Sequence, residues 1–201
     1  MLMQQFMKQL LEWDYYLLLQ VNAVWIHPWA DAFFSFITNF HKQTMWSIPL
    51  AVLWIGILIY IDWRAAISLL ITLVIAVSVS DLFCYRVIKK RIQRLRPSEN
   101  IELSGRLRVI GEAHGSSFPS NHASNVFAAA LVLSFFFRRR SHYFYILAGL
   151  VAYSRVYLGV HYPSDVYAGA FFGLIVGLLT IHVFAPLIFR FVLRNKFTPE
   201  S

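Results

Sequence analysis

The chain has 201 residues, of which 58% are hydrophobic, 17% aromatic and 14% charged. Soluble domains usually carry about a quarter of charged residues, so this composition excludes an ordinary soluble protein and predicts an integral membrane protein, with a length that suits one domain over residues 1–201. The formal net charge of +8 is compatible with an anionic lipid or substrate, whereas no soluble part is left to bind nucleic acid.

Residues 1–41 are apolar but interrupted by polar and charged positions such as Glu12 and Asp14. These interruptions, together with the lack of a small-residue cleavage site, argue against a signal peptide. Several tryptophans and tyrosines in the same stretch are typical of a membrane–water interface. The pattern predicts two interfacial or half-inserted helices, the second beginning near Pro28. A sixth membrane span hidden in this segment is the alternative.

Five apolar stretches follow, and each is predicted to cross the membrane as a helix, because about 30 Å of hydrocarbon requires about 20 residues. A polar turn at residues 62–64 separates the first two. The predicted spans are residues 46–61, 65–88, 122–137, 143–158 and 163–189. The expected fold is therefore an all-α polytopic membrane helical bundle of five to six transmembrane helices with N-terminal interfacial helices.

Small and polar residues inside these stretches give expectations about packing. Gly169, Gly173 and Gly177 are spaced four apart in the last span, which lets another helix approach closely. The single cysteine, Cys84, excludes an internal disulfide and a metal site made of cysteines, and its apolar surroundings predict a packing role. Asp81, near the end of the second span, is expected to have a structural role.

Basic residues in the short connections set the expected orientation. With five spans, Arg64, the arginine run at residues 138–140 and the tail at residues 190–196 share one side, which is predicted to be cytoplasmic. The N-terminal segment, the loop after Lys89 and the turn around His161 share the other side. The polar clusters of the chain therefore face the periplasm or the cell exterior.

The first polar cluster opens a long loop region predicted over residues 89–121. Lys89 and Arg96 are seven residues apart, so they lie on one face if the helix continues to Pro97, where the proline ends it. The common alternative explanation of such a basic run is a stop after a membrane span.

The second cluster is Pro119-Ser120-Asn121-His122, at the predicted start of a span. Proline, serine and asparagine favour helix N-termini, where free backbone N–H groups and the helix dipole attract anions. A histidine that can titrate lies directly beside this end. The alternative is an ordinary capped helix with an incidental histidine.

The third cluster places Arg155, His161 and Asp165 within eleven residues, where one apolar stretch ends and the next begins. Arginine can bind phosphate oxygens with two donors, and imidazole can serve as a nucleophile or a proton carrier. A carboxylate can hold the imidazole in one tautomer. A helix–loop–helix corner with a few interfacial polar residues is the alternative. Charged groups next to hydrocarbon are costly, which favours chemistry on an anion.

The clusters match one pattern in order and spacing: Lys89, six residues, Arg96-Pro97; then Pro119-Ser120-x-His122; then Ser154-Arg155, five residues, His161, three residues, Asp165. In this pattern the chain resembles the type 2 phosphatidic acid phosphatase superfamily, which also includes the soluble vanadium haloperoxidases. The matched motifs cover residues 89–165. One position departs, because the family most often has glycine where Asn121 stands. Asparagine is the commonest non-glycine residue in left-handed backbone, so we expect the site to survive.

The resemblance implies a role for each matched residue. His161 attacks phosphorus and forms a phosphohistidine, Asp165 orients His161, and His122 protonates the leaving oxygen and later activates water. The phosphoryl oxygens are bound by Lys89, Arg96, Arg155, the side chain of Ser120 and the backbone N–H of Asn121. Fixed cations and helix N-termini can neutralise the charge of the transferred group, so no metal or cofactor is expected.

The implied function is that of a membrane lipid phosphatase, which removes a terminal phosphate or diphosphate from undecaprenyl diphosphate, phosphatidylglycerophosphate, phosphatidic acid or a lipid A phosphate. The expected location is the bacterial inner (plasma) membrane, with the site on the periplasmic or extracellular side. Two alternatives use the same pocket: a lipid-to-lipid phosphotransferase and a lipid-phosphate carrier. The sequence has no internal repeat of the kind that carriers show, and no obligate protein partner is predicted.

Overall fold

The computed structural model describes residues 2–40, 43–111 and 113–193, so that Met1, His41, Lys42, Glu112 and the predicted tail from residue 194 onward lie outside the described residues. All regular secondary structure in the described ranges is helical, as predicted. The longer helices are α1 (Leu2–Leu19), α2 (Pro28–Asn39), α3 (Thr44–Phe83), α5 (Asn121–Phe136), α6 (Ser141–Tyr157) and α7 (Pro163–Leu193). The shorter ones are η1 (Gln20–Val24), η3 (Cys84–Ile88), α4 (Lys89–Arg91), η4 (Pro97–Glu99), η5 (Ile101–Leu103) and η6 (Arg138–Arg140).

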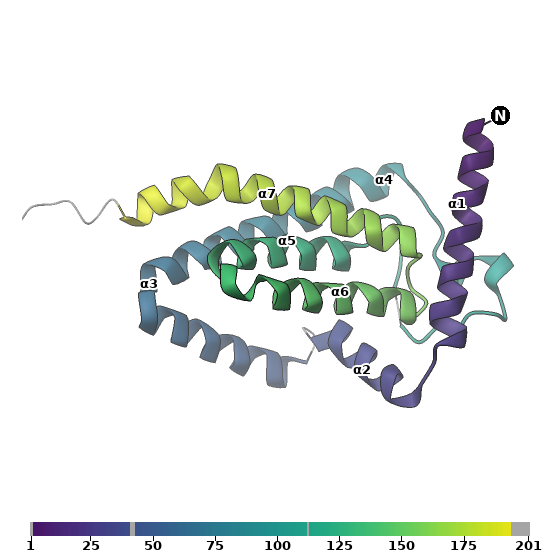
Figure 1. The fold of residues 1–201 in the computed structure, drawn as a ribbon, viewed down its shortest axis with the longest axis horizontal. Coiled ribbons are helices and arrows are strands. Elements are labelled where there is room, and N and C mark those ends of the chain that lie inside the picture. Colours follow the sequence, from purple (N-terminus) through teal and green to yellow (C-terminus); the bar gives the residue numbers. More distant parts are fainter. Residues whose placement is uncertain (1, 41–42, 112, 194–201) are drawn as a thin grey trace, which may run out of the picture.

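Helix α5 is the centre of the bundle and packs against α3, α6 and α7 (Figure 1). Its contact with α7 is close because α7 presents glycines to it. A Cβ atom built on Gly169 or Gly173 would collide with the backbone carbonyl oxygen of Ser120 or Ser124, respectively. The prediction that this glycine spacing admits a neighbouring helix is therefore confirmed. The close contact fixes the starts of α5 and α7, which carry two of the predicted motifs, beside each other.

Helix α3 changes direction in its middle, where Asp62 has non-helical torsions (φ −155°, ψ 97°). The Asp62 Oδ1 atom accepts hydrogen bonds from the backbone N–H groups of Arg64 (3.0 Å) and Ala65 (3.2 Å), and so caps the second half of the helix. Figure 1 shows the two halves of α3 meeting in a sharp bend. The polar turn predicted at residues 62–64 lies at this bend.

Two helical stretches of the described chain, Asp62–Arg91 and Pro163–Ile188, are long and apolar enough to cross a membrane by length and composition. The apolar helices Ser47–Tyr60 and Asn121–Phe136 are shorter. Helix α6, which was predicted as a span over residues 143–158, carries the buried Arg155 near its end. Helix length therefore does not confirm five to six spans, and that number stays a prediction.

The N-terminal helices cover the end of the bundle at which α6 ends and α7 begins (Figure 1). Helix α1 runs across that end, and exposed aromatic side chains such as Trp13 and Trp29 lie on this segment. The segment is attached by the fully buried Asn22, whose amide group donates to the carbonyl oxygens of Arg108 and Tyr157, both at 2.7 Å. An amphipathic helix across a bundle end suits the predicted interfacial position.

Candidate active site

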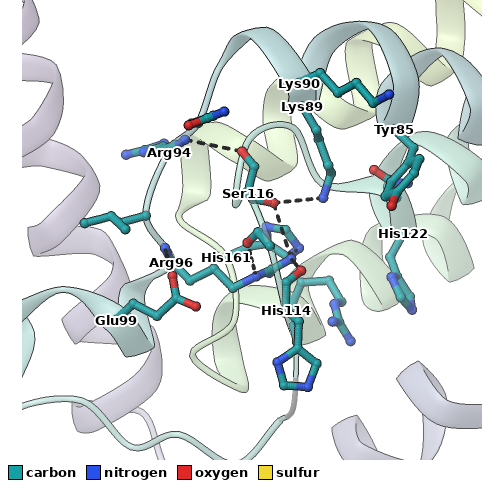
Figure 2. A pocket seen from close by; sticks show the side chains of 16 residues that line it. Tyr85, Lys89, Lys90, Arg94, Arg96, Glu99, His114, Ser116, His122 and His161 are labelled. Carbon is teal, nitrogen blue, oxygen red and sulfur yellow. Dashed lines mark hydrogen bonds between the residues drawn. The ribbon is translucent and has the colours of Figure 1, made fainter.

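A pocket of about 710 Å³ lies at this covered end of the bundle (Figure 2). Six of the eight predicted site residues line it, whereas Ser120 and Asp165 lie behind its wall. The six are Lys89, Arg96, Asn121, His122, Arg155 and His161. Two further cations, Lys90 and Arg94, also line the pocket, against one carboxylate, Glu99, among the residues that the structure describes. The wall therefore carries five cationic side chains, which suits a ligand with several negative charges.

His161 is placed by a turn that only glycine accommodates easily. Helix α6 ends at Tyr157, and Gly159 follows with φ +74°. A Cβ atom on Gly159 would lie 2.8 Å from the carbonyl oxygen of Arg108, so both the torsion and the space favour glycine here. The turn brings the backbone N–H of His161 to within 3.2 Å of the carbonyl oxygen of Arg155. The imidazole is 2% exposed at the pocket wall.

The hydrogen bond of Arg96 fixes the tautomer of His161. The Arg96 Nη1 atom lies 3.3 Å from His161 Nε2, and a guanidinium can only donate, so Nε2 carries no proton. The proton of the neutral ring is then on Nδ1, which lies 3.5 Å from Asp165 Oδ2. This Nδ1 makes no hydrogen bond within the described chain, and such pairs often tighten only when substrate binds.

Burial lowers the pKa of His161 from its ordinary value of 6.5 to about 4. Asp165 opposes this effect, because a nearby negative charge favours the imidazolium, but the nearby Arg96 and Arg155 act in the same direction as burial. The imidazole is therefore neutral around neutral pH. A neutral ring with a free lone pair on Nε2 is the form that can attack an electrophile.

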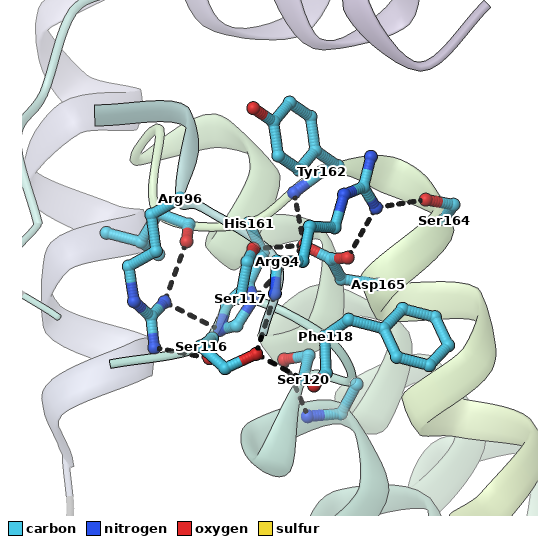
Figure 3. A network of polar contacts seen from close by, with 12 residues as sticks. Arg94, Arg96, Ser116, Ser117, Phe118, Ser120, His161, Tyr162, Ser164 and Asp165 are labelled. Carbon is cyan, nitrogen blue, oxygen red and sulfur yellow. Dashed lines mark hydrogen bonds and ion pairs between the residues drawn. The ribbon is translucent and has the colours of Figure 1, made fainter. Parts of the chain in front are cut away.

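Asp165, in the first turn of α7, is fully buried and accepts hydrogen bonds from several donors (Figure 3). Its Oδ1 atom accepts from Arg94 Nη1 at 2.6 Å. Its Oδ2 atom accepts from the hydroxyl of Ser117 and from the backbone N–H of Tyr162, the latter at 3.0 Å. A buried carboxylate with three donors stays ionised and in one orientation, so it can hold the Nδ1–H of the imidazole.

The structure corrects the expectation that Lys89 and Arg96 share one face of a helix. Helix α4 ends at Arg91, and Ile92 already has extended torsions (φ −109°, ψ 90°). The residues that follow fold back over the pocket, so that Lys89 and Arg96 meet in space by a different route. Prediction of a helix up to Pro97 was wrong because the buried Arg96 is held by tertiary contacts with distant loops, which local propensity does not report.

Arg96 and Lys89 both donate hydrogen bonds to backbone carbonyl oxygens. Arg96, 3% exposed, donates to the carbonyl oxygens of Gly115 (2.9 Å), His114 (3.0 Å) and Val160 (2.9 Å). Lys89 Nζ donates to the carbonyl oxygen of Ser116 at 3.0 Å. A bound anion would therefore exchange contacts with these carbonyls.

Arg155 is anchored from the other side of the pocket. Its Nη1 atom donates to Thr38 Oγ1 of helix α2 at 2.7 Å, and its Nε atom is buried without a hydrogen-bond partner among the described residues. An unsatisfied buried donor is costly, and a donor group beside a pocket is available to an acceptor that enters. The N-terminal segment thus holds one of the predicted phosphate ligands in place.

The start of α5 differs in part from expectation. Ser120 is fully buried and its hydroxyl caps the helix by accepting from the N–H of Ala123 at 3.5 Å, so its side chain does not line the pocket. Asn121 opens the helix with right-handed torsions, since no described non-glycine residue has a positive φ. The side chains of Asn121 and Asn125 donate to Asp81 Oδ1, at 2.9 and 3.1 Å, which gives Asp81 the structural role predicted for it.

Sequence reasoning did not identify three residues that contact Asp165 directly or, for Asp14, through Arg94. They are Asp14, Arg94 and Ser117. Arg94 lies inside the basic run that drew attention to Lys89 and Arg96. The one local indication for Asp14 was that, together with Glu12, it interrupts an apolar stretch. His114 lines the pocket as well.

A family model described as PAP2 superfamily matches residues 65–189. The chain is 28% identical over 168 residues to a lipid A 4'-phosphatase of Bacteroides thetaiotaomicron, a match that covers 80% of this chain but only 65% of that enzyme. It is 34% identical over 152 residues to a putative undecaprenyl-diphosphatase of Escherichia coli, with coverage of 74% and 70%.

Among solved structures, a transmembrane PAP2-type phosphatidylglycerolphosphate phosphatase of Bacillus subtilis superposes with a TM-score of 0.63. The superposition covers 96% of this chain and 90% of that one at 22% sequence identity, so it establishes the shared fold. The fold includes the N-terminal helices and is that of an integral membrane protein. By its family match and its relatives, the chain belongs to the PAP2 superfamily of phosphatases, with lipid phosphatases among its members.

Proposed function

We propose that the protein is a metal-independent lipid phosphatase that works through a phosphohistidine on His161. The observation that carries this proposal is the placement of His161: its Nε2 lies 3.3 Å from Arg96 Nη1 at a pocket that five described cations line, while Nδ1 faces the buried carboxylate of Asp165. The site thus brings together a nucleophile, a group that orients it, and cations that stabilise the charge of a phosphoryl group.

In the first step, Nε2 of His161 attacks phosphorus, the N–P bond forms and the bond from phosphorus to the lipid oxygen breaks. His122, on the first turn of α5 and in the same pocket, gives its proton to the leaving oxygen. The imidazole becomes cationic as the bond forms, and Asp165 stabilises that charge through Nδ1–H. Lys89, Arg96 and Arg155 neutralise the oxygens on phosphorus, which in other phosphoryl-transfer enzymes is often the task of a metal.

In the second step, His122 takes a proton from water, the oxygen of that water attacks phosphorus, and the N–P bond breaks. Inorganic phosphate leaves and His161 returns to its neutral form. The site itself needs no redox partner or cofactor. Ser120 acts through the start of α5 rather than by its side chain, because its hydroxyl caps the helix; Asn121 offers a backbone N–H at the same helix end.

The substrate is a lipid with a terminal phosphate or diphosphate, and residues 1–201 form one integral-membrane domain with five to six spans. Helices α1 and α2 lie at the outer interface, and the site faces the periplasm or cell exterior of a bacterial inner membrane. Similarity to a lipid A 4'-phosphatase and to an undecaprenyl-diphosphatase supports two substrate classes, lipid A phosphates and undecaprenyl diphosphate. Phosphatidylglycerophosphate and phosphatidic acid complete the set to be compared.

The test is phosphate release by the purified protein in detergent, in the presence of a metal chelator, from each of these four lipids. Release that persists in chelator and identifies one preferred lipid supports the proposal. Loss of release on addition of chelator would overturn metal independence. Absence of release from every lipid, with phosphate passed to an added acceptor lipid instead, would identify a phosphotransferase.

A further inference from the structure

We propose that Asp14 and Arg94 are positioning residues for the reaction: they hold the catalytic carboxylate of Asp165, and so make the N-terminal helix α1 part of the active site. The inference rests on the proposed function, in which Asp165 orients the nucleophile. Asp14 lies outside the three motifs, on a helix that precedes the matched region at residues 65–189, and Arg94 occupies one of the six unspecified positions of the first motif.

Arg94 joins the two carboxylates with separate nitrogens, and Figure 3 shows its contact with Asp165. Its Nη1 atom lies 2.6 Å from Asp165 Oδ1, and its Nη2 atom lies 2.6 Å from Asp14 Oδ2. The planar guanidinium is thereby fixed at both ends, which a lysine ammonium could not reproduce. Since Asp165 Oδ1 has this ion pair, its other oxygen, Oδ2, remains directed at Tyr162, Ser117 and the His161 ring.

Asp14 also caps the helix that carries Asp165. Its Oδ1 atom accepts from the backbone N–H of Ser164 at 2.8 Å, and its Oδ2 atom accepts from the Ser164 hydroxyl. Ser164 lies in the first turn of α7, where a negative charge is stabilising. The same hydroxyl accepts from Arg94 Nη1 at 2.7 Å. A side chain of α1 therefore fixes the first turn of α7 and the arginine together.

These groups are buried in a way that ordinary surface ion pairs are not. Asp14 is 6% exposed, Asp165 is 0% exposed, and the side chain of Arg94 is 19% exposed. Buried charges are costly unless they are paired, and removing one partner leaves the other uncompensated. Arg94 also stacks over the ring of Tyr162, with its central carbon 3.9 Å from the ring centroid. Tyr15 of α1 in turn stacks on Tyr162, with the two ring centroids 5.6 Å apart.

The arrangement predicts opposite electrostatic effects for the two positions. Asp165 raises the pKa of His161, whereas Arg96 and Arg155 lower it. Neutralising Arg94 leaves the negative charge of Asp165 less balanced, so the pKa of His161 should rise. Neutralising Asp14 leaves Arg94 to balance Asp165 more fully, so the pKa of His161 should fall. Mere loosening of the fold would not give shifts of opposite sign.

The experiment compares Arg94→Gln and Asp14→Asn with wild type by kcat, KM and the pH profile of kcat/KM, on the best lipid of the panel. We expect kcat to fall about tenfold in each variant, with KM nearly unchanged. A loss of this size is typical for residues that orient a reacting group without touching the substrate. The acid limb should move to higher pH in Arg94→Gln and to lower pH in Asp14→Asn. Arg94→Lys should keep the limb near the wild-type position while kcat stays reduced.

The matched control is Asp31→Asn. It breaks a different ion pair of the N-terminal segment, between Asp31 Oδ2 and Arg108 Nη2 at 2.7 Å, which does not touch Asp165. Thermal unfolding in detergent is measured for all variants. An equal loss of kcat in Asp31→Asn, or acid limbs that move in the same direction in both test variants, would overturn the inference. Full kcat in Asp14→Asn would do so too. A wild-type protein without phosphatase activity would instead refute the proposed function.

Discussion

The Nη1 atom of Arg96 lies 3.3 Å from Nε2 of His161, the atom that would attack phosphorus. The same guanidinium donates to carbonyl oxygens of the loop at His114 and Gly115. An incoming phosphoryl group has to take the place next to Nε2, and its oxygens can then accept the donors of Arg96. Arg96 thus contacts the nucleophilic nitrogen when the site is empty and binds the phosphoryl oxygens when substrate is present.

Arg96→Lys is therefore expected to impair both binding and rate. A lysine keeps the charge but loses the fork of donors, so kcat/KM should fall by about a hundredfold, as for the loss of one group that stabilises a developing oxyanion. Steady-state kinetics on the preferred lipid measures this. Arg91→Lys is the control, because Arg91 is exposed and does not line the pocket. Equal activity of Arg96→Lys and wild type would refute the assignment of Arg96.

His161→Ala removes the proposed nucleophile. Phosphate release should fall by at least about a thousandfold, because no other group in the pocket would form the covalent intermediate, while the thermal unfolding transition remains. His182→Ala is the matched control, since His182 is an exposed histidine of α7 whose Nδ1 donates to the carbonyl oxygen of Leu178 in the same helix, at 2.9 Å. Orthovanadate, which adopts the five-coordinate geometry of the transition state, should inhibit wild type; unchanged turnover in excess vanadate would contradict the mechanism.

The pH dependence follows from the buried state of His161. Because its pKa is lowered to about 4, the neutral nucleophile persists as the pH falls through 6.5, the ordinary value for a histidine. The acid limb of kcat/KM that belongs to His161 should therefore appear near pH 4, and activity should be lost only as the pH falls through that value. The contradicting result is an acid limb near pH 6.5 that remains when each of the other histidines is replaced. That limb would belong to His161 and would mean that the ring is solvated in the working enzyme.

Sequence patterns predicted the site better than they predicted the connections that build it. Histidine, arginine and aspartate at fixed spacing identified His161, Asp165 and Arg155, because a helix end fixes the geometry of residues close in sequence. Asp14 and Arg94 are 80 residues apart, and their contact exists only because α1 crosses the bundle end. Local patterns contain no information about such a contact.

The number of membrane spans was harder to predict for a related reason. Apolar stretches show where helices form, and all five predicted stretches are helical in the structure over most of their length. Whether a helix of 16 or 17 residues, such as α5 or α6, crosses the bilayer depends on how it packs and tilts within the bundle. Composition alone does not contain that information.

The glycines of α7 offer a test of the packing that joins the two helix starts. Gly173→Ala puts a methyl group against the backbone carbonyl of Ser124, so α7 has to move away from α5. We expect a loss of about 1–3 kcal/mol in the free energy of unfolding, the usual cost of overpacking, and a lower phosphatase rate because the two catalytic helix ends separate. Thermal unfolding in detergent and phosphate release measure the two effects.

Gly149→Ala is the matched control for that substitution. Gly149 lies within α6, and no atom lies within 4 Å of the position that its Cβ would occupy. Alanine favours a helix by about 1 kcal/mol over glycine, so this variant should be as stable as wild type or more stable, with an unchanged rate. If Gly173→Ala were equally well tolerated, the close contact of α5 with α7 would not be what holds His122 and Asp165 at one end of the bundle.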